Sequence, residues 1–215
     1  MIFETGIDGD TVTLELDTSI EHGILLSGGL DSAVLLGLMV KVFLNNGDEV
    51  KIQPFTIRDS GSYEHSKNVI DYINDRYQIS IPDTIQIDLG DVHHAKRTPL
   101  GMREIMINYG DRIEYVWQAT NQNPPKEEFD YARFGNQDNF PNRVKSETFY
   151  RNKLPFIHLR KHHIVNMIDL HELGDFETIT HSCTKYKKYR CMSCFQCLER
   201  RWAFDKVNKK DRGII

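Results

Sequence analysis

A short glycine-containing segment near residue 30 combines residue types that can hold an anion. It reads Ser27-Gly28-Gly29-Leu30-Asp31-Ser32, follows the apolar run 23–26 and precedes a helix-like pattern over 30–46. Glycines let the backbone turn tightly and bring N–H groups close to a ligand, and a helix start adds unpaired N–H donors and a partial positive charge. Serine hydroxyls can donate to the same anion, and an aspartate can hold Mg²⁺ beside it. The segment therefore predicts a phosphate site, with a tight turn and a capped helix as the simpler alternative.

A second chemical cluster contains all four cysteines of the chain. They follow the pattern Cys-x7-Cys-x2-Cys-x2-Cys and are Cys183, Cys191, Cys194 and Cys197. Four thiolates complete the tetrahedral coordination of Zn²⁺ and leave no open position, so the spacing predicts a structural zinc site. An iron–sulfur cluster and a set of free buried thiols are the alternatives. His181 precedes the first cysteine by two positions, and we expect it to be an ordinary polar neighbour because four cysteines suffice.

The elements that must position these clusters alternate between strand-like and helix-like patterns. Strands are expected at 23–26, 50–57, 84–89, 113–120 and 155–159, and helices at 30–46, 63–77, 101–108, 161–173 and 196–208. This order predicts an α/β fold with a Rossmann-like parallel sheet and helices on both faces. Alternation over 11–16 predicts a small hairpin ahead of the sheet. The stretch 121–150 has no periodicity and predicts a long irregular loop.

Composition narrows the class of protein. A net charge of −4 at pH 7 argues against nucleic-acid binding through bulk charge. The sequence has no window of the roughly 18 apolar residues that a membrane helix needs, and no basic region followed by an apolar run opens it. We therefore expect a cytoplasmic protein of one domain, or of one domain with an appended module, without membrane association.

The glycine segment lacks the Gly-Lys-Ser/Thr ending of a Walker A loop and is not the dinucleotide-binding glycine pattern. It resembles the signature of the PP-loop, or N-type, ATP pyrophosphatases. This resemblance implies that ATP is cleaved between its α and β phosphates, that AMP passes to a substrate oxygen, and that the loop holds pyrophosphate. By position, Ser27, Asp31 and Ser32 are implied catalytic residues, with ATP and Mg²⁺ as cofactors. The expected nucleotide contacts are Leu26, Ser27, Gly28, Gly29, Leu30, Asp31 and Ser32 of this segment. Thr56 and Ile57 are expected to face adenine, because the carboxyl ends of strands face ligands in open α/β sheets.

The two ends of the chain together resemble the 7-cyano-7-deazaguanine synthase family. The zinc segment of that family continues as Cys-x2-Arg, which Cys197 and Arg200 match. Its preceding Pro-Leu-x-x-Leu-x-Lys-x-Glu-Ile string loses the first Leu and the Glu here and keeps four positions: Pro155, Leu159, Lys161 and Ile164. Lys161 is thereby a candidate for a charge contact with phosphate or adenylate, and a solvated lysine at a helix start is the alternative.

The middle of the chain departs from that family. Of its Gly-Val-Asn string only Asn121 remains, and the string that lines its deazaguanine pocket is replaced by 134–141, which keeps Asp138 and Pro141. Asn121 and Asp138 are candidate substrate residues. A carboxylate such as Asp138 can accept the two N–H donors of a guanine-like edge, whereas a turn cap is the alternative.

The resemblance implies an ATP-dependent C–N ligase that acts as a homodimer. It would convert 7-carboxy-7-deazaguanine and ammonia to 7-cyano-7-deazaguanine and release AMP and pyrophosphate. Two alternatives stay open: a related enzyme with another carboxylate or acceptor, and an inactive nucleotide-binding partner module. A tRNA-thiolating enzyme is a weaker alternative because the zinc spacing consumes every cysteine. We expect residues 1–160 to form the nucleotide-binding domain and 161–215 a helical zinc-binding region packed on it.

Overall fold

The computed structural model describes residues 1–57, 62–134 and 151–213. A five-stranded, wholly parallel sheet lies at its centre in the order β5-β4-β3-β6-β7. The strands are β3 (Glu21–Leu25), β4 (Ile52–Ile57), β5 (Ile85–Ile87), β6 (Ile113–Trp117) and β7 (Asn152–Lys153). The predicted α/β class with a parallel sheet is therefore confirmed.

Helices cover both faces of this sheet. They are α1 (Leu30–Asn46), α2 (Ser62–Tyr77), α3 (His94–Tyr109), α4 (Lys161–Leu170), α5 (Phe176–Ile179) and α6 (Phe195–Lys206), with a short 3-10 helix η1 (Tyr131–Phe134). Ile24 and Ile52 pack in one apolar cluster with α1 and α2, whereas Phe55 and Val116 pack in another with Met102 of α3. Residues an odd number of positions apart in a strand point to opposite faces, so the two clusters lie on opposite sides of the sheet. Within the described ranges, no helix combines the length and apolarity needed to cross a bilayer.

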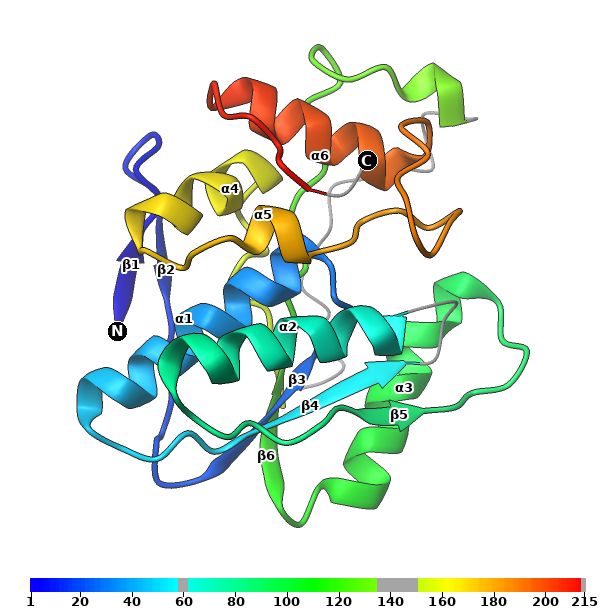
Figure 1. Ribbon diagram of the computed structural model, residues 1–215. Helices are drawn as coiled ribbons and strands as arrows, with labels where there is room; N and C mark the ends of the chain where they lie inside the picture. Colours follow the sequence, from blue (N-terminus) through cyan, green and yellow to red (C-terminus); the bar gives the residue numbers. More distant parts are fainter. Residues whose placement is uncertain (58–61, 135–150, 214–215) are drawn as a thin grey trace.

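The long helix α1 is buried on nearly every side. On the side of α1 that faces away from the sheet, α4 and α5 pack against it, and α6 packs in turn against α4 (Figure 1). Gly37 makes the contact with α5 possible, because a Cβ there would lie 2.9 Å from the Phe176 ring. Gly47 ends the helix with a left-handed φ of 75°, and its N–H donates to Leu44 and Phe43 carbonyls. A helix this enclosed holds its first turn rigidly at the carboxyl edge of the sheet.

A separate antiparallel pair precedes the sheet. It consists of β1 (Ile2–Glu4) and β2 (Thr11–Thr13), as the predicted hairpin requires. The His171 ring packs edge-on against Phe3, and its Nε2 lies 2.7 Å from the Glu4 carbonyl oxygen. The hairpin is thereby tied to the C-terminal helices.

The predicted strand at 155–159 is wrong. This segment is a turn in which Ile157 N–H donates to the Leu154 carbonyl and Leu159 N–H to the Phe156 carbonyl. Phe156 and Leu159 are both fully buried, and a spacing of three suits a turn rather than a strand. The strand that pairs with β6 is the preceding β7.

Two helix boundaries also differ from expectation. The helix predicted over 101–108 begins at His94 and includes Pro99. The helix predicted over 161–173 ends at Leu170, and the four-residue α5 follows it after a turn. The predicted helix over 196–208 is observed as α6.

The C-terminal helices share an apolar cluster with the sheet domain. Ile164 of α4 and Phe204 of α6 belong to the same cluster as α1. The division of the chain into two parts at residue 160 stays a prediction.

Acid is expected to destabilise this fold through His162 at the start of α4. Burial, with a smaller effect of His163, lowers the pKa of His162 from 6.5 to about 4. Between these values the unfolded chain binds a proton that the folded chain does not, so stability should fall as pH drops from about 6.5 to about 4. His162→Phe keeps a ring against Trp202 and cannot titrate, so its unfolding free energy should depend less on pH.

Urea unfolding at about pH 7.5 and about pH 5 measures this difference. His158→Phe is the control because His158 is exposed. An unchanged acid dependence in His162→Phe would contradict the assignment.

Candidate functional site

The glycine segment forms the connection between β3 and α1, as predicted. Gly28 has a φ of 74°, in the left-handed region, and Gly29 takes the N-cap position with extended backbone. No side chain caps α1 at this end. The first N–H groups of a helix lack partners within it, so those that follow Gly29 are available to an anion at the end of the sheet.

The serines of the loop hold its shape. Gly29 N–H donates to Ser27 Oγ at 3.3 Å, and Ser32 Oγ donates to the Gly29 carbonyl at 3.1 Å. The two hydroxyl oxygens lie 3.3 Å apart. Both hydroxyls therefore face the same turn and can reorient toward a bound oxyanion.

Gly28→Ala is expected to disrupt this loop. A Cβ at Gly28 would lie 2.3 Å from His65 Cβ and 2.4 Å from its backbone carbon, in addition to the left-handed strain of about 1–2 kcal/mol. Gly47→Ala is a matched control. Its φ of 75° imposes the same strain, but a Cβ at Gly47 would meet no atom of the described residues within 4 Å. The unfolding free energy of Gly28→Ala should fall by more than that of Gly47→Ala in denaturant titrations. Equal losses would show that the contact with His65 is unimportant.

A cavity of about 370 Å³ opens at the carboxyl ends of the strands. It is lined by residues that end or follow three strands: Leu25 to Ser27 after β3, Phe55 to Ile57 at the end of β4, and Gln118 to Thr120 after β6. β4 and β6 lie on opposite sides of β3, so the chain connections diverge at this point. Ligands of open α/β sheets bind at such divergence points. The cavity includes the predicted nucleotide contacts Leu26, Thr56 and Ile57.

Thr56 is fixed at the floor of this region. Its hydroxyl donates to the Leu26 carbonyl at 2.6 Å and lies 3.0 Å from the Thr84 hydroxyl. These buried contacts join β3 and β4 where both strands end and fix the position of Thr56 in the cavity.

A second cavity of about 210 Å³ shares the loop with the first. Ser27, Gly29, Asp31 and Ser62 line both cavities. The far wall of the second comes from the C-terminal region and comprises Lys161, His181, Ser182, Cys183, Thr184 and Gln196. The loop thus separates a cavity at the sheet edge from one that faces the cysteine segment.

Asp31 and Lys161 meet at the second cavity. Asp31 Oδ2 lies 3.1 Å from Lys161 Nζ, while Asp31 Oδ1 is buried without a hydrogen-bond partner among the described residues. A buried carboxylate oxygen left unpaired beside a helix start is the kind of ligand that Mg²⁺ takes. Asp31 therefore fits a magnesium site.

Lys161 is buried, and its alternative as a solvated lysine is wrong. Its ammonium lies between Asp31 and Glu199, and the distance to Glu199 Oε2 is 2.5 Å. Burial acts to lower the pKa of Lys161, but the two carboxylates outweigh it and raise the pKa above its usual 10.5. Lys161 is therefore charged at neutral pH.

Sequence inspection did not single out Glu199. It is buried in α6, one residue before Arg200, and joins the C-terminal helix to the glycine loop through Lys161. A glutamate in an amphipathic helix is usually solvated. The sequence signal for a role of Glu199 is its position next to Arg200, which matches the family pattern.

Two histidines stack behind the loop. The rings of His65 and His181 have centroids 4.2 Å apart and planes at 14°. His181 N–H donates to the Gly28 carbonyl at 2.9 Å, and His181 Nε2 lies 2.7 Å from the Tyr186 carbonyl oxygen. Burial and the neighbouring His181 lower the pKa of His65 below 6.5. His181 therefore connects the cysteine segment to the loop and is not part of the cysteine cluster.

The four cysteines converge on one point ahead of α6. The ligand atoms of Cys183, Cys191, Cys194 and Cys197 all lie within 4.8 Å of one another. Backbone N–H groups of Ser193 and Cys194 donate to Cys191 Sγ. Burial acts to raise the pKa of Cys191, but hydrogen bonds from the side chain and backbone of Ser193 and from Cys194 lower it to about 6, whereas burial raises the pKa of Cys197. The cluster can hold a metal ion.

The candidate substrate residues have different outcomes. Asn121 is buried just after Gln118 to Thr120, but it does not line the larger cavity. Asp138 lies outside the described residues. The substrate roles of both residues stay predictions.

The fold and the site define an α/β protein with an uncapped helix start at the carboxyl edge of a parallel sheet and a four-cysteine cluster. The sequence matches no protein-family model and no curated protein. Among solved structures, the chain is similar to the U34-tRNA thiolase NcsA from Methanococcus maripaludis, which was solved with its 4Fe–4S cluster. The identity is 12%, the TM-score is 0.45, and the match covers 88% of this chain and 66% of that one.

Proposed function

We propose that the chain is a PP-loop ATP pyrophosphatase that activates a carboxylate by transferring AMP to it. The observation that carries this proposal is the place of Asp31 at the uncapped start of α1. Its buried Oδ1 lacks a partner among the described residues, and the N–H groups beside it suit an anion. A carboxylate oxygen and an anion site side by side fit a polyphosphate that carries Mg²⁺.

The two cavities suggest how ATP is divided along the loop. Adenosine and the α-phosphate occupy the larger cavity at the sheet edge, where Thr56 and Ile57 lie. The β- and γ-phosphates lie over the start of α1 and toward Lys161. The scissile bond between the α- and β-phosphates is then held at Ser27 and Gly29, which line both cavities.

Catalysis on this arrangement consists of positioning and charge neutralisation. A substrate carboxylate oxygen attacks the α-phosphorus, the bond to the bridging oxygen breaks, and pyrophosphate leaves with the electron pair. Ser27, Ser32 and the N–H groups of the loop donate to the departing oxygens, and Lys161 holds Asp31 in place. Magnesium bound at Asp31 would neutralise phosphate charge.

For the substrate we propose 7-carboxy-7-deazaguanine, which ammonia and a second ATP carry through an amide to the nitrile. Support comes from the resemblance of the segment around Lys161 and of the cysteine segment to the synthases of that reaction. In the first step ammonia displaces AMP from the acyl adenylate. In the second, the amide oxygen takes AMP from ATP with release of pyrophosphate, and loss of AMP and of both amide protons yields the nitrile.

The test is AMP and pyrophosphate release by the purified protein with ATP, Mg²⁺ and a panel of carboxylates. Release with 7-carboxy-7-deazaguanine, and nitrile formation when ammonia is added, are expected. Release only with another carboxylate would favour a related enzyme with a different substrate. Absence of AMP with every carboxylate, while ATP still binds, would favour a nucleotide-binding partner module.

For the cysteine cluster we propose Zn²⁺. Thiolates around one tetrahedral ion with Zn–S distances of about 2.3 Å lie about 3.8 Å apart, and Cys191 Sγ lies 4.0 Å from Cys197 Sγ. A cluster of several irons holds its thiolates farther apart, because each ligates a different iron. A closed four-thiolate site has no position for substrate, so its contribution is to the fold.

The expected homodimer is a further proposal and rests on the family resemblance alone. Light scattering coupled to size-exclusion chromatography tests it. A mass of one chain, which is 25.1 kDa, at micromolar concentration would exclude a stable dimer.

A further inference from the structure

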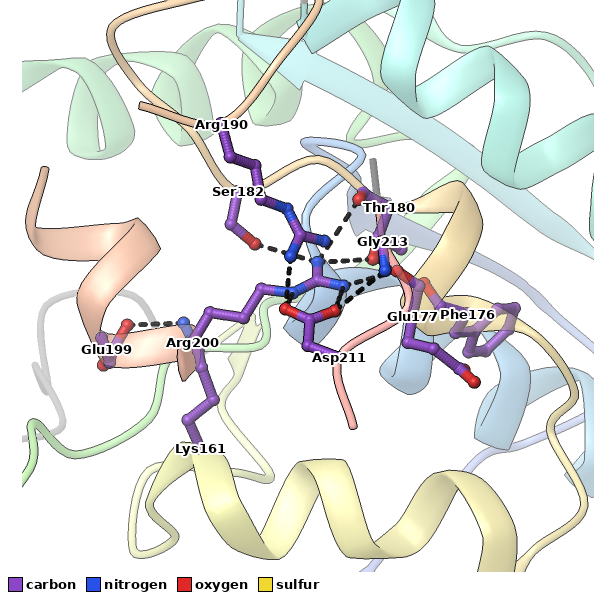
Figure 2. A network of polar contacts seen from close by, with 10 residues as sticks. All are labelled: Lys161, Phe176, Glu177, Thr180, Ser182, Arg190, Glu199, Arg200, Asp211 and Gly213. Atoms are coloured by element: carbon purple, nitrogen blue, oxygen red, sulfur yellow. Dashed lines mark hydrogen bonds and ion pairs between the residues drawn. The ribbon is translucent and has the colours of Figure 1, made fainter. Parts of the chain in front are cut away.

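Paired charges attach the half-exposed C-terminal tail to two buried arginines. Arg200 of α6 is fully buried, and its Nε and Nη2 donate to the two oxygens of Asp211 at 2.9 and 3.0 Å. Arg190, from the cysteine segment, donates to the same carboxylate. Figure 2 shows the Asp211 carboxylate facing the Arg200 guanidinium, with a further dashed contact to the guanidinium of Arg190. This network shares no residue with the ion pairs that Lys161 makes with Asp31 and Glu199.

The remaining donors of Arg200 hold the segment that follows α5. Nη1 donates to Thr180 Oγ1 at 2.8 Å and to Ser182 Oγ at 3.3 Å, and Nη2 donates to the Glu177 carbonyl at 2.6 Å. A guanidinium has five donors in a fixed planar fork, so a carboxylate on one edge determines the direction of the other. Asp211 therefore fixes where Arg200 places Thr180 and Ser182.

The segment 180–182 is also part of the phosphate-binding region. His181 N–H donates to the Gly28 carbonyl in the glycine loop, and Ser182 lines the smaller cavity opposite Asp31. Hydrogen bonds and the backbone of 180–182 thus connect Asp211 through Arg200 to the loop. The two cavities share the loop residues Ser27, Gly29 and Asp31, but Ser182 lines only the smaller one, and most of the rest of the larger cavity is lined by the strand ends and α3.

We propose that Asp211 is a positioning residue for pyrophosphate: by orienting Arg200 it fixes the far wall of the smaller cavity and so sets the affinity of the loop for pyrophosphate. This inference rests on the proposed function. It predicts a selective effect, because AMP occupies the larger cavity and does not meet that wall.

The experiment measures the binding of inorganic pyrophosphate with Mg²⁺, and separately of AMP, to the zinc-loaded protein by calorimetry. Asp211→Asn removes the charge at nearly constant volume. Its affinity for pyrophosphate should fall about tenfold, and its affinity for AMP should stay within about twofold of wild type. Lys209→Ala is the matched control: Lys209 ties the same tail to Asp169 of α4 without touching Arg200, so both affinities should be unchanged.

Asp211→Glu keeps the charge on a longer side chain and should bind pyrophosphate with an affinity between those of wild type and Asp211→Asn. If Asp211→Asn does not fold, Asp211→Glu decides the question by the same comparison. Equal loss of both ligands, or loss of neither, would overturn the inference. Wild-type protein that binds no pyrophosphate would instead contradict the proposed function.

Discussion

Asp31→Asn is expected to lower the rate of AMP release by at least about a hundredfold. The substitution keeps the shape of the side chain but removes the charge that Oδ1 offers to Mg²⁺. The pyrophosphate that develops during adenylation then loses its counter-ion, while adenosine contacts at the strand ends are unaffected. The loss should therefore appear in kcat, with AMP affinity nearly unchanged.

Steady-state AMP release at saturating ATP and Mg²⁺ measures this effect. Asp71→Asn is the control, because Asp71 is exposed and pairs with Lys67 on α2. The melting temperature of Asp31→Asn should stay close to that of wild type, since Lys161 keeps Glu199 as a partner. A variant that releases AMP at the wild-type rate would exclude Asp31 from the site.

Cys194→Ser is expected to lower the melting temperature by about 10 °C. Cys194 is the N-cap residue of α6, and Cys197 lies in the first turn of that helix. Loss of the metal would release this end of α6, which carries Glu199 and Arg200. Activity should therefore fall together with stability, because Lys161 and the wall of the smaller cavity depend on those two residues.

Metal content and thermal unfolding of the two proteins measure this effect. Wild type should contain one zinc per chain, and prolonged treatment with a chelator followed by Mg²⁺ should reproduce the variant. Lys188→Ala, at an exposed position between Cys183 and Cys191, should keep both the metal and the stability. Iron with visible absorbance in wild type would replace the zinc assignment by a cluster.

The sequence predicted the parts of the site that are local in the chain. The glycine loop can be recognised because its residues are consecutive. The strand before it and the helix after it can also be recognised from the pattern of neighbouring residues. The cysteines were recognisable for the same reason, since all four lie close together in the sequence. In both cases the spacing of the residues along the sequence is enough to indicate the chemistry.

The parts that the sequence did not reveal join distant segments. Lys161 joins Glu199 to Asp31, but Glu199 alone resembles an ordinary charged residue of a helix. Asp211 gave no signal because its role depends on Arg200 and Arg190 meeting it in three dimensions. The turn at 155–159 was mistaken for a strand because a short apolar run fits several conformations, and only the burial of Phe156 and Leu159 separates them.

The group of Asp31, Lys161 and Glu199 has a consequence for the order in which ligands arrive. Two carboxylates and one ammonium leave this pocket with one excess negative charge next to the helix start. This negative charge repels a polyphosphate without a metal ion. A polyphosphate already complexed with magnesium carries positive charge that offsets the repulsion. Under the proposed function, we therefore expect the pocket to discriminate between the free and the metal-loaded nucleotide when the ligand first arrives, before any bond is broken.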